Sequence, residues 1–172
     1  MEAALKKFAE QGYNSTSISQ IAETAGISKG LIYNYFKNKE EILRSIFMDI
    51  FSGIFSRYNL PENGVITREI FIEFINTNID IILEDQDRAV LYFSLFTQPH
   101  VMAKFKNELT HFIQPLVGMF LNYYKAQGHE NPMAMMRLVS ACIDGVQMHM
   151  VLDRENFPVE DVRKLLIETF VK

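Results

Sequence analysis

Apolar residues recur at helical spacing in three short segments at the start of the chain, and each segment carries its own start or stop signal. Gly12 ends the first, because glycine adopts the positive φ of a helix C-cap without strain. Ser17 and Gln20 match a capping box that opens the second segment, and Gly26 ends it. Ser28 then caps the third, directly after the turn. Two short helices joined by a tight turn that contains glycine are typical of a helix-turn-helix.

The rest of the chain predicts further helices separated by proline or glycine. Asn38 caps a long one with a wide apolar face, and the segment Pro61–Gly64 breaks the chain after it. Pro115 is expected to kink or divide a later, longer helix. Because apolar and polar residues do not alternate with period two in any segment, the fold class is predicted to be all-α. We expect a three-helix domain over residues 1–45 and a larger helical domain over residues 46–172. The helices of the larger domain are expected over residues 67–83, 87–97, 100–126, 132–152 and 158–171.

Composition agrees with a large helical core, since the 172 residues include 14 Phe and 9 Met but only 8 Gly and 5 Pro. Apolar residues make up 48% and charged residues 22%, which argues against a disordered chain. No uncharged apolar stretch is long enough for a membrane span, and the N-terminus has no signal-peptide pattern, so we expect a cytoplasmic protein without a membrane partner. Cys142 is the one cysteine and the histidines show no i, i+4 pairing, so neither a disulfide nor a metal site is expected.

The net charge of −4 argues against a nucleic-acid binder until the chain is divided. Residues 1–46 hold six basic and five acidic residues, whereas the rest of the chain holds eleven and sixteen. The slightly positive end is the one that contains the predicted helix-turn-helix, and such asymmetry can mark an end that binds a polyanion. The asymmetry is mild and decides nothing alone.

The third short helix, predicted to run from Ser28 to about Phe36, carries the candidate chemistry. A recognition helix packs one side on its own domain and turns a polar side to the major groove of DNA. On the polar side, Lys29 can reach guanine O6 or N7, Asn34 can hydrogen-bond adenine, and Gly30 lets the backbone come close to bases or sugars. The residues expected to pack into the domain are Ile21, Ala22, Ile27, Ile32 and Phe36.

A longer motif around this helix resembles the TetR/AcrR family of bacterial transcription regulators. The motif reads Gly12-Tyr13-x-x-Thr16-Ser17-Ile18-x-x-Ile21-Ala22-x-x-Ala25-Gly26-Ile27-Ser28-Lys29-Gly30-x-Ile32-Tyr33-x-Tyr35-Phe36-x-x-Lys39-Glu40. The resemblance implies a homodimeric repressor whose third helix enters the major groove of a palindromic operator. It also implies that a small-molecule effector binds the C-terminal domain, moves the two DNA-binding heads and weakens operator binding.

The resemblance also implies roles for individual residues. It assigns Ser17, Tyr35 and Lys39 to phosphates and Ser19 to a base edge. Relatives carry further residues before the first helix, whereas Met1 already lies inside it here, so we expect either a longer native start or the loss of a minor-groove contact. The predicted DNA-binding residues, including Asn34 from its amide chemistry, are Ser17, Ser19, Ser28, Lys29, Gly30, Tyr33, Asn34, Tyr35 and Lys39.

An aromatic and methionine-rich inner surface is the candidate effector pocket of the larger domain. These side chains could equally fill the core, and the expectation of a cavity comes mainly from the resemblance. Asp144 lies in an otherwise apolar stretch, where its carboxylate binds a cationic group of the effector, faces solvent or caps a neighbouring helix. The predicted pocket residues are Phe93, Phe96, Met102, Phe112, Met119, Tyr123, Asp144 and Met148.

The last two helices are the candidate dimer interface. Ala141 and Gly145 are small at i, i+4, so another helix can approach closely, and an apolar stripe follows on the final helix. The alternative is a terminal helix that packs only on its own subunit. The resemblance favours the dimer, because the family forms a four-helix bundle from this pair of helices across the two-fold axis. The predicted interface residues are Ala141, Gly145, Val162, Leu165, Leu166 and Phe170.

The predicted function is a TetR-like, ligand-responsive DNA-binding regulator, namely a repressor released by a small apolar or amphipathic effector. The alternative is a helical small-molecule carrier that keeps the motif without using DNA. No triad spacing, phosphate-binding glycine loop or paired-carboxylate motif is present, so neither an enzyme activity nor a cofactor is expected. Salt separates the first two functions, because binding to phosphates weakens steeply with ionic strength while binding of an apolar ligand hardly responds.

Overall fold

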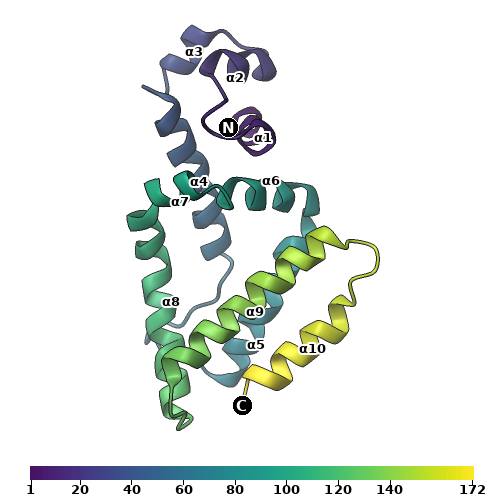
Figure 1. The fold of residues 1–172 in the computed structure, drawn as a ribbon. Helices are drawn as coiled ribbons and strands as arrows, with labels where there is room; N and C mark the ends of the chain where they lie inside the picture. Colours follow the sequence, from purple (N-terminus) through teal and green to yellow (C-terminus); the bar gives the residue numbers. More distant parts are fainter. The chain divides into compact units, whose positions relative to one another are not determined.

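The structure, a computed structural model, describes all 172 residues and contains ten α-helices and no strands (Figure 1). The prediction of an all-α fold is therefore confirmed. None of the helices combines the length and the apolar character that crossing a membrane requires. The helices are α1 Glu2–Gln11, α2 Ile18–Ala25, α3 Lys29–Tyr33, α4 Lys39–Phe55, α5 Arg68–Glu84, α6 Gln86–Phe96, α7 Pro99–Lys104, α8 Lys106–Ala126, α9 Pro132–Leu152 and α10 Val159–Phe170.

Local signals set the ends of the first helices. The Gln20 N–H donates to Ser17 Oγ at 3.2 Å and the Ser17 N–H donates to Gln20 Oε1 at 2.7 Å, so the predicted capping box opens α2. Gly26 ends α2 with a φ of +66°, a left-handed conformation that glycine adopts without strain. Ser28 caps α3 as predicted, since its hydroxyl accepts a hydrogen bond from a backbone N–H of the first turn. The helix itself is shorter than predicted and ends at Tyr33.

The helix predicted over residues 100–126, which Pro115 was expected to kink or divide, is divided at a different place. The break lies at Phe105, whereas Pro115 lies exposed inside the continuous α8. Phe105 is fully buried, and its ring stacks on that of Phe47 with centroids 4.8 Å apart. We attribute the position of the break to this long-range packing, which no local sequence pattern reveals.

The chain forms two compact units. The first contains residues 1–53 and 87–108, and the second contains residues 54–86 and 109–172. The first unit thus combines α1, α2, α3 and most of α4 with α7 and nearly all of α6, whereas the predicted N-terminal domain ends at residue 45. The predicted boundary, which separates DNA binding from effector binding, stays a prediction.

Aromatic rings form much of the core of the first unit. Phe47 on α4 is fully buried, and its ring lies 4.5 Å from that of Phe51, 5.4 Å from that of Phe96 and 4.8 Å from that of Phe105, measured between centroids. These rings come from α4, α6 and the break between α7 and α8. The packing therefore fixes the part of α4 that follows the helix-turn-helix.

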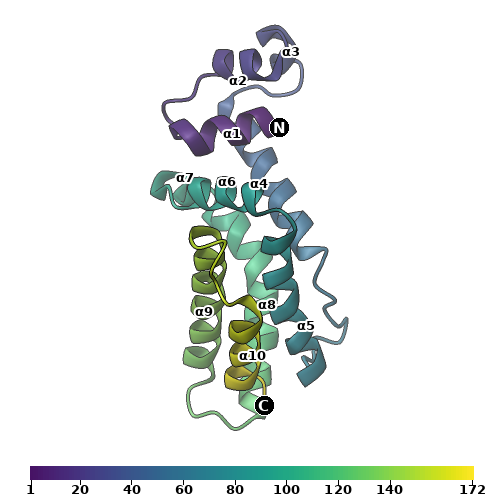
Figure 2. The ribbon, with the colours of Figure 1, turned by 90° about the vertical axis from the view of Figure 1, so that its right-hand side faces the viewer.

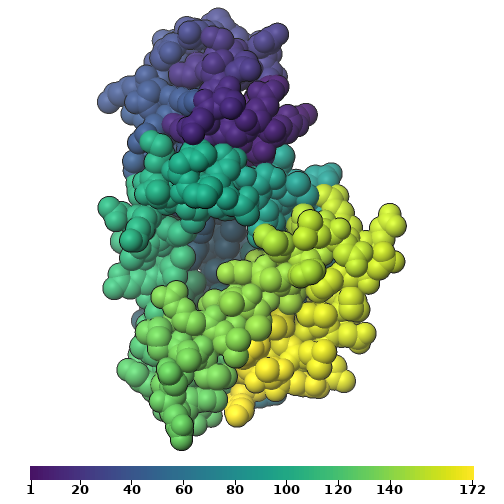
Figure 3. Space-filling view, viewed as in Figure 1, coloured from purple at the N-terminus to yellow at the C-terminus, as the bar shows by residue number.

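The last two helices lie side by side in the second unit, and both pack on α5 (Figures 1 and 2). Phe71 on α5 is fully buried and packs against Phe120 and Tyr123 of α8, with ring centroids 4.8 and 5.2 Å apart. Arg163 on α10 donates to Asp80 Oδ1 on α5 at 2.8 Å. The outer sides of α9 and α10 form one continuous surface, coloured light green to yellow in Figure 3.

Candidate nucleic-acid interface, effector region and dimer surface

The inner sides of α2 and α3 pack as a helix-turn-helix requires. Ile21 and Ala22 on α2 and Ile32 on α3 are at most 5% exposed. The Ile27 N–H donates to the Ala22 carbonyl at 3.0 Å and so closes the turn after α2. The Ile27 side chain is 41% exposed, so its predicted place in the core is wrong. It belongs to the turn, outside the two buried helix faces.

The outer side of α3 and the residues after it present polar and aromatic side chains to solvent. Ser28, Lys29 and Asn34 are exposed, and Tyr33 and Tyr35 are 48% and 75% exposed. The Lys29 ammonium lies 5.9 Å from the centroid of the Tyr33 ring. Ammonium, amide and hydroxyl groups are thus available on one short helix for contacts to base edges and phosphates.

Gly30 is the second residue of α3, and nothing inside the protein requires glycine there. Its φ is not positive, and an added Cβ would meet only Ser28 Oγ, at 3.9 Å, which is an ordinary contact. Glycine in a helix interior destabilises by about 0.5–1 kcal/mol relative to alanine. The missing side chain leaves room for a close approach from outside the chain, and the predicted contact of Gly30 with DNA stays a prediction.

The N-terminus of α2 exposes the next pair of predicted contacts. Ser17 Oγ accepts the capping bond from Gln20, which leaves the Ser17 hydroxyl hydrogen to donate outward. Ser19 follows in the exposed first turn. Together with the unpaired N–H groups and the positive dipole end of a helix, two such hydroxyls are suited to a phosphate.

Lys39, the remaining predicted DNA contact, lies in a different environment. As the first residue of α4, it donates from its ammonium to the carbonyl oxygens of Tyr13, Asn14 and Thr16 at 2.7, 3.2 and 2.8 Å. Burial lowers the pKa of this ammonium. A phosphate contact, which stays a prediction, would have to replace one of these bonds, because an ammonium has only three donors.

The predicted effector-pocket residues are divided between the two units. Phe96, in the first unit, packs edge-on against Phe47 in the aromatic core. The three members in the first unit are Phe93, Phe96 and Met102, and the five in the second are Phe112, Met119, Tyr123, Asp144 and Met148.

Individual members of the second group have different surroundings. The Tyr123 hydroxyl donates to the Lys172 carbonyl at 2.7 Å and thus holds the end of the chain. Met148 is 38% exposed. Asp144 is also exposed, although partial desolvation raises the pKa of its carboxyl. The structure does not gather the predicted set around one described pocket, and its role stays a prediction.

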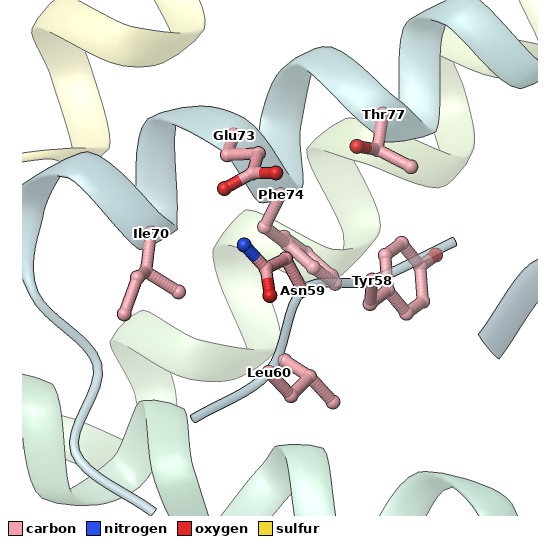
Figure 4. A pocket seen from close by; sticks show the side chains of 7 residues that line it. All are labelled: Tyr58, Asn59, Leu60, Ile70, Glu73, Phe74 and Thr77. Atoms are coloured by element: carbon pink, nitrogen blue, oxygen red, sulfur yellow. The ribbon is translucent and has the colours of Figure 1, made fainter. Parts of the chain in front are cut away.

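A polar cluster of Tyr58, Asn78 and Gln147 lies beside α5 and was not predicted from the sequence. The Tyr58 hydroxyl donates to Asn78 Oδ1 at 3.0 Å, and the Gln147 side-chain amide on α9 donates to the Asn78 carbonyl at 2.7 Å. Burial raises the pKa of Tyr58 to about 12. The available signal was Asn78 itself, a polar residue on the buried apolar stripe of α5. Tyr58 also lines a shallow hollow, together with Asn59, Leu60, Ile70, Glu73, Phe74 and Thr77 (Figure 4).

Part of the predicted dimer interface is exposed. Ala141 and Gly145 lie exposed on α9, and an added Cβ at Gly145 would meet nothing within 4 Å. Leu165 on α10 is 59% exposed. Leu138 and Leu152, at 51% and 72%, add large apolar side chains on α9. Exposed apolar side chains on two neighbouring helices offer a surface for a protein partner.

The other predicted interface residues turn toward their own subunit. Leu166 and Phe170 are only 6% and 4% exposed, and the Tyr124 hydroxyl donates to the Phe170 carbonyl at 3.2 Å. Val162 is half-buried. Leu166 and Phe170 therefore offer little surface to a second subunit, because they complete the core beneath α10.

Comparisons with known proteins agree with the N-terminal geometry. The family described as bacterial regulatory proteins, tetR family, matches residues 1–46. The HTH-type transcriptional regulator YuxN of Bacillus subtilis is 39% identical over 88 residues, which cover 51% of this chain and 30% of that protein. The fatty acid metabolism regulator protein of the same organism is 49% identical over 49 residues, or 28% of this chain and 25% of that protein. The matched segments thus span less than a third of either relative.

The fold as a whole has a solved counterpart. The crystal structure of the transcriptional regulator FadR from Bacillus subtilis in complex with stearoyl-CoA matches with a TM-score of 0.78 at 22% identity. The match covers 99% of this chain and 95% of that chain, and it shows a shared fold. Residues 1–46 thus match the tetR family of bacterial regulatory proteins, and the chain as a whole shares its fold with a solved transcriptional regulator.

Proposed function

We propose that the chain is a DNA-binding transcription regulator, a homodimeric repressor that reads a palindromic operator and is released by a small apolar or amphipathic effector. The observation that carries this proposal is α3, whose inner side is buried while its outer side presents exposed polar side chains around a glycine that the fold does not require. Such a helix is suited to enter a major groove.

Base reading is assigned to α3 and phosphate binding to its surroundings. Lys29 would donate to guanine O6 or N7, and Asn34 would hydrogen-bond adenine. The hydroxyls of Ser17 and Tyr35 would donate to phosphates, which fix the register without reading sequence. Gly30 would let the α3 backbone approach the groove.

A symmetric dimer follows from the same proposal. Two copies of α3 related by a two-fold axis match the two halves of a palindrome. The exposed apolar surface of α9 and α10, which includes Leu138, Leu152 and Leu165, supports this dimer. Leu166 and Phe170 are left out of the interface because they are buried in their own subunit.

Selection of bound fragments from a genomic DNA library tests the function. An enriched palindrome is expected, with an affinity whose logarithm falls against the logarithm of salt concentration by about 0.9 per phosphate contact. A folded protein that enriches no fragment and binds no mixed-sequence duplex at low salt would support the carrier alternative instead.

The effector is proposed to be apolar or amphipathic because the second unit holds Phe112 and Met119 among its half-buried residues, together with the polar cluster of Tyr58, Asn78 and Gln147. Stearoyl-CoA, the ligand in the FadR structure of the same fold, is a suitable probe. Titrated into the operator complex, it should release the DNA, whereas free coenzyme A should not. Full operator affinity at saturating stearoyl-CoA would exclude a long acyl chain as the effector.

Lys29→Ala should relax the preference for one or two operator positions. A bidentate contact to a base is worth about 1–3 kcal/mol of discrimination, and this substitution would remove it. Binding to a set of single-base operator variants measures the effect. Lys125→Ala, which removes an exposed lysine on α8, is the matched control and should keep every preference. Equal weakening of all variants by Lys29→Ala would contradict the assignment.

A further inference from the structure

We infer that Lys39 is a positioning residue for DNA binding, whose ammonium holds the loop between α1 and α2 and thereby sets the N-terminus of α2 against the DNA. The inference rests on the proposed function, because it concerns how the helix-turn-helix meets a duplex. It gives Lys39 a role other than the direct phosphate contact that the family resemblance implies.

The loop brings three carbonyl oxygens to one ammonium. Those of Tyr13, Asn14 and Thr16 lie 2.7, 3.2 and 2.8 Å from Lys39 Nζ. Carbonyls in an irregular loop have no helical partners, so their hydrogen bonds must come from elsewhere. A compact ammonium with three donors satisfies all three, and none of its N–H groups remains for a phosphate.

Further interactions hold the same loop. The Tyr13 N–H donates to Gln98 Oε1 at 3.0 Å. The Thr16 hydroxyl donates to the Gly12 carbonyl at 2.9 Å, and Thr16 is only 2% exposed. The Lys39 ammonium also lies 4.5 Å from the centroid of the Tyr13 ring. The loop is therefore held by Gln98 and by the Thr16 side chain as well as by Lys39.

The held loop leads directly into the proposed phosphate site. Thr16, whose carbonyl accepts from Lys39, precedes Ser17, the N-cap of α2. A shift of the Thr16 carbonyl therefore shifts the Ser17 hydroxyl and the first N–H groups of α2. Lys39 acts on DNA through this connection, 23 positions away along the chain.

Substitution with arginine separates positioning from a phosphate contact. The Lys39→Arg variant keeps the positive charge and can still bind phosphate well, but a planar, larger guanidinium does not fit three converging carbonyls as an ammonium does. We expect Lys39→Arg to weaken binding to a mixed-sequence duplex by about tenfold or more, since hydrogen bonds to a charged group are lost. The control, Lys37→Arg, changes an exposed lysine next to α4 and should bind as the wild type does.

A double-substitution cycle with Ser17→Gly tests the route of the effect. Glycine is tolerated at an N-cap but lacks the hydroxyl. If Lys39 acts through Ser17, Lys39→Arg should weaken binding much less in the Ser17→Gly background than in the wild type, because coupled residues are not additive. Thermal unfolding of each variant confirms that binding is measured on folded protein.

Two results would overturn the assignment. One is wild-type affinity of Lys39→Arg, which a phosphate contact predicts. The other is full additivity with Ser17→Gly, which a general loss of stability predicts. A wild-type protein that binds no duplex at low salt would instead refute the proposed function itself, and the role of Lys39 in DNA binding with it.

Discussion

Gly30→Leu should lower operator affinity by a factor of about a hundred or more while leaving the protein folded. A leucine at this position meets only Ser28 Oγ near its Cβ, so the fold has room for it. It also replaces the poorest ordinary helix former, a gain of up to about 1 kcal/mol. On the DNA side, a side chain that holds α3 away from the groove disturbs several base contacts at once, and even one mismatched base pair costs about 1–3 kcal/mol.

The measurement pairs operator titration with thermal unfolding. Gly53→Leu is the matched control, because Gly53 is another exposed helical glycine whose added Cβ would meet nothing within 4 Å. This control should gain stability in the same way and keep its operator affinity. Unchanged operator affinity in Gly30→Leu would show that α3 does not approach DNA as proposed.

Leu165→Glu should convert the dimer to monomers and thereby lower operator affinity by a large factor. The side chain is 59% exposed in the isolated chain, so glutamate is tolerated there before assembly. In a symmetric interface each subunit brings its own carboxylate, and burying an unpaired charge costs several kcal/mol. A monomer contacts one half-site alone, which forfeits the roughly 10²–10⁴-fold advantage of linked binding.

Sedimentation velocity gives the oligomeric state, and operator titration gives the consequence. Leu83→Glu is the control, because Leu83 is 42% exposed at the end of α5 and belongs to neither α9 nor α10. It should remain dimeric and bind DNA normally. A Leu165→Glu variant that stays dimeric would place the subunit contact away from this part of α10.

Sequence patterns located the helix-turn-helix because its signals are local. The Ser17 and Gln20 side chains bond to backbone groups within three residues, and Gly26 needs only its own φ. Interactions of such short range are written into consecutive residues, so the capping box and the turn follow from the sequence alone. The all-α class and the polar outer side of α3 follow in the same way, from helical periodicity.

Tertiary structure decided what depends on residues far apart in the chain. The break at Phe105 reflects packing on Phe47, whereas local propensity favoured Pro115. Leu166 continues an apolar stripe that a partner or its own subunit could cover, and the fold buries it. Lys39 has the charge and the sequence position expected of a phosphate contact. Its ammonium nevertheless donates to carbonyl oxygens more than twenty positions earlier in the chain. Sequence by itself thus determined the class of fold and the polar outer side of α3. Only three-dimensional packing decided which side chains remain free for a partner, because the fold brings hydrogen-bond donors and apolar faces against partners within the chain.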